Sequence, residues 1–215
     1  MRYSRVIRTF SLVAALSLAN AAYAADEDAA AGPKAAMKGL FEAIEAADAA
    51  AVRTQFNAAT PEEKALADAY ADQITAAKSL GEAAKAKFGA TGDPLTKGMP
   101  MKDSIAQLDK ADVSVTGNQA TVKLPGQPRS VRLTKIDGKW RVDLADYAGA
   151  TPENIAGQTA VLRDMSQALR SIATDIAADK FISPADAQRA LNQKLQGVLF
   201  NTLQKHPPTS RPVKP

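Results

Sequence analysis

Residue types that often carry catalysis or bind metals are scarce in this sequence, which contains one histidine and no cysteine. His206 directly precedes Pro207-Pro208 and lacks partners for a base or a ligand set, so we interpret it as solvated. Serine and threonine are plentiful, but a hydroxyl without a nearby histidine or lysine base is not a nucleophile. The sequence contains no glycine-rich phosphate loop, no His-Glu-x-x-His zinc motif and no EF-hand.

Two carboxylates, Asp143 and Asp146, lie at the end of a predicted strand and could pair as acid and base. Asp143 falls on the polar face of that strand and Asp146 lies beside a loop, so we interpret both as solvated acids. We therefore predict no catalytic residue, no cofactor, no cofactor-binding residue and no metal ligand. A protein that is not an enzyme is favoured, and catalysis is left open.

The residues that could bind a partner are four cations on predicted strands. Strand alternation places them opposite the apolar side chains of Val122, Leu133, Trp140 and Val142. Four cations on one sheet face could receive an anionic ligand, polymer or partner, or could simply keep a solvated face soluble. The candidate residues are Lys123, Arg132, Lys139 and Arg141.

Helices are predicted before the strands. Pro33 opens a first helix with an apolar stripe of Met37, Leu40, Phe41 and Ile44, and Asp48 can cap a second. Thr60-Pro61-Glu62-Glu63 is a capping-box sequence that starts a long helix, which Gly89 ends. The expected buried residues of that helix are Leu66, Tyr70, Ile74, Ala77, Ala84 and Phe88.

From residue 113 the apolar period changes from 3.6 to 2, which predicts four antiparallel strands in sequence order. Gly117-Asn118 and Asp137-Gly138 supply tight turns, and the last strand carries Trp140, Val142 and Leu144. Two further helices start at Thr151-Pro152-Glu153 and at Ser183-Pro184 and form a helical hairpin. The residues expected to face inward on the last helix are Ala187, Leu191, Leu195, Val198, Leu199 and Thr202.

The first 24 residues have the pattern of a secretory signal: Arg2, Arg5 and Arg8, then an apolar run, then Ala22-Tyr23-Ala24. We expect cleavage between Ala24 and Ala25 and a soluble periplasmic or extracellular protein without a membrane span. The run is too short for a span, which needs about 20 residues. Loss of the leader leaves 24 basic against 23 acidic residues, and this near-neutral balance argues against nucleic-acid binding.

The predicted fold class is α+β, with N-terminal helices packed on a four-stranded antiparallel meander and a C-terminal helical hairpin. The expected organisation is a signal peptide (1–24), a flexible leader (25–32), an α+β domain (33–148), the helical hairpin (149–205) and a disordered proline-rich tail (206–215). The hairpin either packs on its own domain or forms a homodimer through the C-terminal helices.

Three segments of the sequence are similar to a known protein family: "PKAAMKGLFEAIEAADAAAVRTQF" (33–56), "GNQATVKL" (117–124) and "VRLTKIDGKWRVDL" (131–144). About half of the chain that follows the leader resembles the nuclear-transport-factor-2-like superfamily, a cystatin-like α+β cone, and especially its small exported bacterial members. The long helix at 61–88 and the C-terminal helices depart from that pattern. The resemblance implies a fold, while the family's His/Asp or paired-acid sites have no counterpart here.

We therefore predict an exported, non-catalytic binding or interaction module with a protein or an anionic envelope component as its partner. The alternative is a ligand-binding or enzymatic member of the resembled superfamily. A concave apolar cavity with convergent polar groups would favour that alternative.

Overall fold

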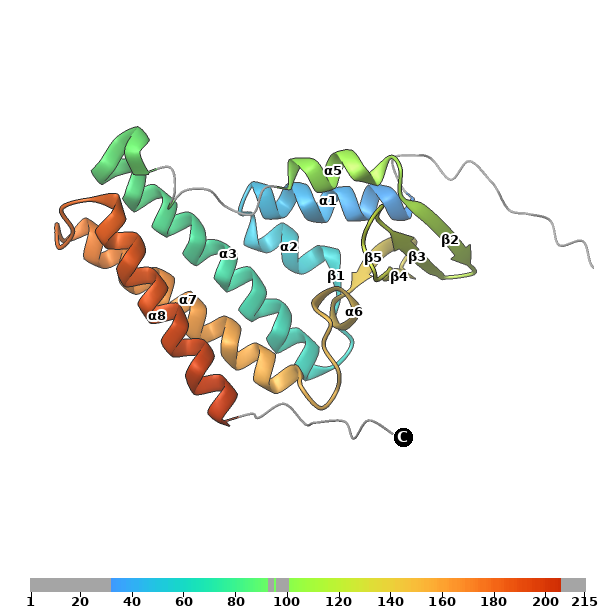
Figure 1. Cartoon of the computed structure of the whole chain (residues 1–215). Coiled ribbons are helices and arrows are strands. Elements are labelled where there is room, and N and C mark those ends of the chain that lie inside the picture. Colours follow the sequence, from blue (N-terminus) through green and yellow to red (C-terminus); the bar gives the residue numbers. More distant parts are fainter. Residues whose placement is uncertain (1–31, 93–94, 96–100, 206–215) are drawn as a thin grey trace, which may run out of the picture.

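The computed structural model describes residues 32–92, residue 95 and residues 101–205. The predicted signal peptide (1–24), most of the predicted leader (25–32) and the predicted tail (206–215) lie outside the described residues. Figure 1 shows the arrangement of the described elements. In chain order they are α1 (Pro33–Glu45), α2 (Ala49–Gln55), β1 (Phe56–Asn57), α3 (Pro61–Phe88), the 3-10 helix η1 (Gly89–Gly92), α5 (Lys102–Leu108), β2 (Asp112–Thr116), β3 (Gln119–Lys123), β4 (Val131–Ile136), β5 (Lys139–Asp143), α6 (Leu144–Ala148), α7 (Ile155–Ala177) and α8 (Pro184–Lys205).

The α+β class is confirmed, but the described sheet is mixed and has five strands in the order β1-β5-β4-β3-β2. Strands β2 to β5 form the expected antiparallel meander, and β1 adds parallel to β5, with Phe56 beside Val142. The sequence analysis missed β1 because two residues are too few to display an alternation. Leu144, which we predicted to be in the last strand, is instead the first residue of α6.

The two predicted turns are present and fix the register of the meander. Asp137 and Gly138 both have positive φ, as the two central residues of a type I′ hairpin turn do. At the other turn only Gly117 has a positive φ, which is typical of type II′. Each turn leaves two residues between paired strands, so Ile136 lies opposite Lys139 and Thr116 opposite Gln119.

The main core lies between the N-terminal helices and one face of the sheet. The stripe of α1 is buried as predicted and packs with Val52 of α2 against the sheet. Leu133 is completely buried at the middle of the sheet, between Ala120 of β3 and Val142 of β5. The sheet residues of this core include Ala120, Val122, Leu133, Trp140 and Val142.

Both predicted N-terminal caps in this part of the chain are confirmed. The Asp48 carboxylate accepts hydrogen bonds from the backbone N–H groups of Ala50 and Ala51. The Thr60 hydroxyl accepts from the N–H of Glu63, whose side chain accepts in turn from the N–H of Thr60. Gly89 ends α3 with a φ of 59°.

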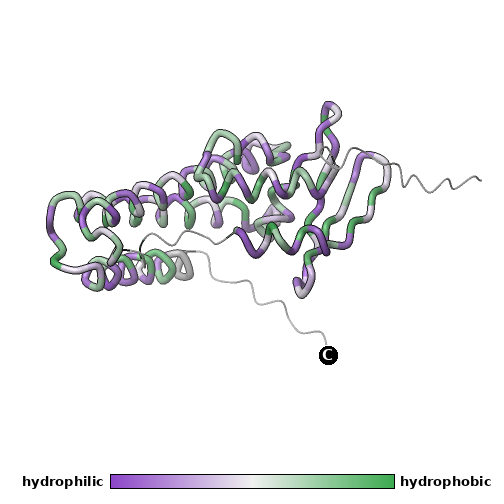
Figure 2. The backbone as a smooth tube through the Cα atoms, turned by 90° about the horizontal axis from the view of Figure 1, so that it is seen from above, coloured by the Kyte–Doolittle hydropathy of each residue, from purple (hydrophilic) through white to green (hydrophobic). Residues whose placement is uncertain are grey.

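A second core lies among α3, α7 and α8, away from the sheet (Figures 1 and 2). In α3, Ala77 is exposed rather than buried as predicted, and Ala76 and Leu80 are buried instead. Alanine lies on several sides of α3, so periodicity alone could not single out the buried face. The long helix α7 packs along α3, and α8 packs on α7, so the helices of 149–205 share a core with α3.

The C-terminal helices differ from the sequence analysis in two details. Helix α7 begins at Ile155 after Asn154, three residues beyond the predicted start, and the Asn154 side chain accepts from the N–H of Thr151. On α8, Ala187 and Leu191 are buried as expected, but Leu199 is 51% exposed. No helix in the described part of the chain combines the length and apolar character that a bilayer crossing requires.

Candidate functional site

The strand register divides the sheet into an apolar face and a polar face. Leu133 lies opposite Val142 and Ala120, so these side chains share the face that α1 covers. Thr134 lies opposite Arg141 and Gln119 and therefore points to the other side. We call this other side the polar face, and its residues are Asp112, Ser114, Thr116, Gln119, Thr121, Lys123, Arg132, Thr134, Ile136, Lys139, Arg141 and Asp143.

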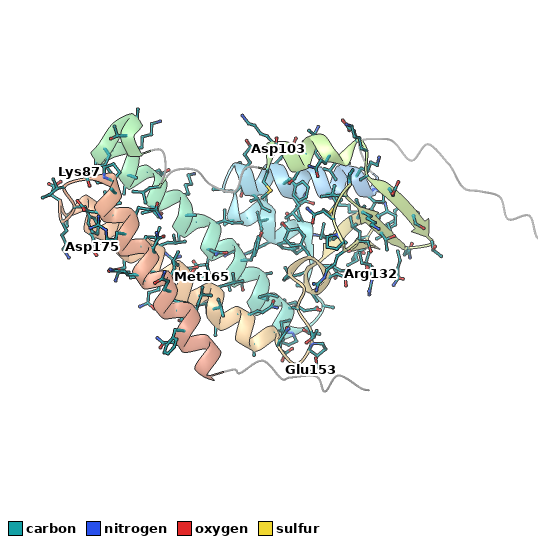
Figure 3. All side chains as sticks on the ribbon, viewed as in Figure 1. Lys87, Asp103, Arg132, Glu153, Met165 and Asp175 are labelled. Carbon is teal, nitrogen blue, oxygen red and sulfur yellow. The ribbon has the colours of Figure 1, made fainter. Side chains whose placement is uncertain are left out.

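All four predicted cations lie on this polar face, as their alternation required. Lys123, Arg132 and Lys139 are exposed, and Arg141 is partly exposed. Between them, the hydroxyls and amides of β2 and β3 are also exposed. Figure 3 shows Arg132 on the side of the sheet away from α1 and α5. The polar face is therefore accessible over most of its width in the described structure.

Two of the four cations already have partners within the chain. Arg132 lies 3.5 Å from the Asp146 carboxylate, which also accepts a 3.2 Å hydrogen bond from the Arg132 backbone N–H. Arg141 donates to the backbone carbonyl of Thr54, at the end of α2. These contacts hold Arg132 against α6 and Arg141 against α2, so each arginine also fixes a helix to the sheet.

The two lysines are different. Among the described residues, the side chains of Lys123 and Lys139 make no hydrogen bond and no ion pair, and Lys123 lies opposite the exposed Asp112 across the β2–β3 pair. An exposed ammonium group without an internal partner is accessible to an incoming anion, and each such exposed ion pair contributes about 0–1 kcal/mol. The lysines are therefore the cations that a partner would contact with the least rearrangement of the fold.

The acids weighed in the sequence analysis hold local structure together. Asp143 accepts from the amide of Asn57 at 2.8 Å and from the Thr134 hydroxyl at 3.0 Å. Asp146 pairs with Arg132, as described above. Each carboxylate thus has a partner that belongs to the fold. His206 lies outside the described residues.

A shallow hollow of about 170 Å³ lies at one end of the polar face, where β5 meets the end of α2. Its lining consists of Thr54, Gln55, Lys139, Trp140 and Arg141. Pockets that enclose organic ligands usually span about 300–1,000 Å³ and are mostly apolar. The hollow can thus hold one small charged group of a larger partner, such as a carboxylate or a phosphate.

The sequence analysis missed the contribution of α2 to this hollow. Thr54 and Gln55 reach it because β1 pairs with β5 and brings the end of α2 beside Arg141. That parallel pairing joins residues 86 positions apart and leaves no local pattern in the sequence.

Among the described residues, no three histidine or acidic side chains come together in a set that could hold a metal ion. Every fully buried side-chain nitrogen or oxygen atom in the same part of the chain has a hydrogen-bond partner. Comparisons of the chain with protein-family models, with curated proteins and with solved structures find no match.

Proposed function

We propose that this protein is an exported, non-catalytic binding module that receives an anionic partner on its polar face. The observation that carries the proposal is the accessibility of that face, in which exposed Lys123 and Lys139 flank a surface of hydroxyls and amides. Export is proposed from the pattern of residues 1–24, and membership of the nuclear-transport-factor-2-like superfamily from the segments at 33–56, 117–124 and 131–144.

The electrostatics of the face support an anionic partner. Four cations lie on the face against the carboxylates of Asp112, Asp143 and Asp146, and of these three acids Asp146 is paired with Arg132. The unengaged charges on the face are those of Lys123 and Lys139 and, opposite Lys123 at the sheet edge, the exposed carboxylate of Asp112. Complementary surface charge of this kind mainly accelerates association and selects among partners.

A binding face is also a better match to the structure than a ligand pocket. The apolar side of the sheet is filled by α1 and α2, and the hollow at β5 is small and lined by charged and polar side chains beside Trp140. A partner that spans the width of the face would contact several strands at once. The hollow would then hold one of its anionic groups beside Lys139 and Arg141.

The test is a charge reversal that leaves the fold's own contacts in place. The variant Lys123→Glu/Lys139→Glu changes two side chains without a described partner. Binding to a defined polyanion, poly-glutamate, is measured by titration at low salt and at about 0.15 M salt. The affinity should fall at least about tenfold, because two attractions become two repulsions.

A matched control separates this site from overall charge. The variant Lys78→Glu/Lys85→Glu makes the same change in net charge at exposed positions of α3, far from the sheet in Figure 1. It should bind poly-glutamate and partners from the exported fraction like the wild type. Equal losses in both variants would mean that net charge alone governs binding, and unchanged binding in both would refute the proposed face.

A further inference from the structure

The free edge of the sheet has no partner in the described structure. Strand β2 is the last strand in the order, and all five of its residues are exposed. Val113 and Val115 point to the apolar face, opposite Val122 and Ala120, yet they are 37% and 49% exposed. The apolar face thus continues past the core to an uncovered strand.

The backbone of this edge is ready to pair. Because a two-residue turn closes the β2–β3 hairpin, Thr116 and Gln119 exchange hydrogen bonds, and so do Ser114 and Thr121. The N–H and C=O groups of Val113 and Val115 therefore point outward. Natural sheet edges are commonly protected by lysine, proline or a bulge, and β2 has none of these.

We propose that β2 pairs with β2 of a second copy of this chain, antiparallel and centred on Ser114. In this register Val113 lies opposite Val115 of the other copy, and both residues exchange backbone hydrogen bonds with their counterparts. Asp112, the one charged residue of the strand, lies opposite Thr116, so no like charges meet. The strand is complementary to itself in hydrogen bonds, apolar side chains and charge.

The pairing uses the same surface on both copies, so it closes at two chains. At the other edge of the sheet, β1 has two residues and offers little backbone for a further strand. The two-fold axis of this antiparallel strand pair is perpendicular to the sheet. The polar faces of the two copies therefore lie on the same side of a continuous ten-stranded sheet. The inference stands independently of the proposed function, but it would double the cations available to one long partner.

Disulfide trapping tests the register, and the chain helps because it contains no cysteine. In the proposed dimer the two copies of residue 114 are directly opposed, with Cα atoms about 4.5 Å apart. A disulfide accepts Cα separations of about 4.4–6.8 Å. The purified Ser114→Cys variant should therefore form covalent dimers under mild oxidation, detected by non-reducing electrophoresis.

The control lies on the same strand. Thr116→Cys is equally accessible, but its two copies would be about 13 Å apart along the pair, beyond the reach of a disulfide. Thr116→Cys should become linked only when mixed with Asp112→Cys, which this register places opposite it. Equal trapping of Ser114→Cys and Thr116→Cys, or no trapping of Ser114→Cys, would overturn the proposal.

Sedimentation of the cysteine-free chain provides the second measurement. A five-residue strip is small, so a reversible, concentration-dependent dimer is expected. Val115→Lys should weaken association at least tenfold, and Leu199→Lys, at one of the two exposed large apolar residues in the described part of α8, should leave it unchanged. Circular dichroism verifies that both variants fold. A dimer that resists Val115→Lys but dissociates with Leu199→Lys would place the contact on α8, and a monomer at every concentration would also refute pairing through β2.

Discussion

Two tyrosines at the junction of α3, α6 and the sheet should make the protein sensitive to alkaline pH. Tyr70 and Tyr147 pack around Phe56, with ring centroids 5.6–6.0 Å apart, and their hydroxyls lie 3.4 Å from each other. Burial raises the pKa of Tyr70 well above its ordinary value, and the neighbouring Tyr147 adds to the shift. Burial also raises the pKa of Tyr147, although its hydrogen bond with Tyr70 partly opposes this.

The direction of the pH effect follows from proton binding. A tyrosine in the unfolded chain loses its proton near pH 10, whereas the folded protein retains both protons to higher pH. The folded state thus binds more protons above about pH 10, and the free energy of unfolding should fall as the pH rises further. Each retained proton contributes a slope of about 1.4 kcal/mol per pH unit, so the pair contributes up to about 2.7.

Denaturant unfolding between neutral pH and about pH 12, with tyrosinate absorbance followed in parallel, tests this reasoning. After the proposed cleavage between Ala24 and Ala25, Tyr70 and Tyr147 are the two tyrosines that remain to observe. The substitution Tyr70→Phe should cost less than about 1.5 kcal/mol at neutral pH and should reduce the alkaline slope by about half. Ionisation of both tyrosines near pH 10 in the folded protein, with no loss of stability, would refute the account of this junction.

Three further predictions concern stability in denaturant unfolding. Leu133→Ala should cost about 2–5 kcal/mol, because Leu133 is completely buried, whereas Val115→Ala at the exposed edge should cost less than about 1; equal costs would contradict the placement of the core. Thr60→Ala should cost about 1 kcal/mol through loss of the capping box, and Thr60→Ser should restore most of it. Gly138→Ala should cost about 1–2 kcal/mol because φ is 76° there, while Gly32→Ala, at a negative φ with open space around its Cβ position, should cost less, through the poorer N-cap alone.

The features that the sequence predicted correctly are those with local signals. The Thr60–Glu63 capping box, the Asp137-Gly138 turn and the alternation in β3 each depend on residues within a few positions of one another. The same alternation placed all four cations on one face of the sheet.

The features that it missed depend on contacts between distant segments. The addition of β1 beside β5 is a pairing of two residues, and the partners of Arg132 and Arg141 are set by where α6 and α2 end. Alanines lie on several faces of α3, so the helical period does not show which face is buried. The position of α7 decides which residues of α3 are buried.

The central claim is that the polar face is the binding surface, and the most direct measurement is an amide NMR titration of the labelled protein with poly-glutamate. We expect shift changes centred on β3, β4 and β5, strongest near Lys123 and Lys139, and screened as salt is added. The Lys123→Glu/Lys139→Glu variant should lose these changes. Shifts confined to α3, α7 and α8, or shifts that persist unchanged in that variant, would contradict the account.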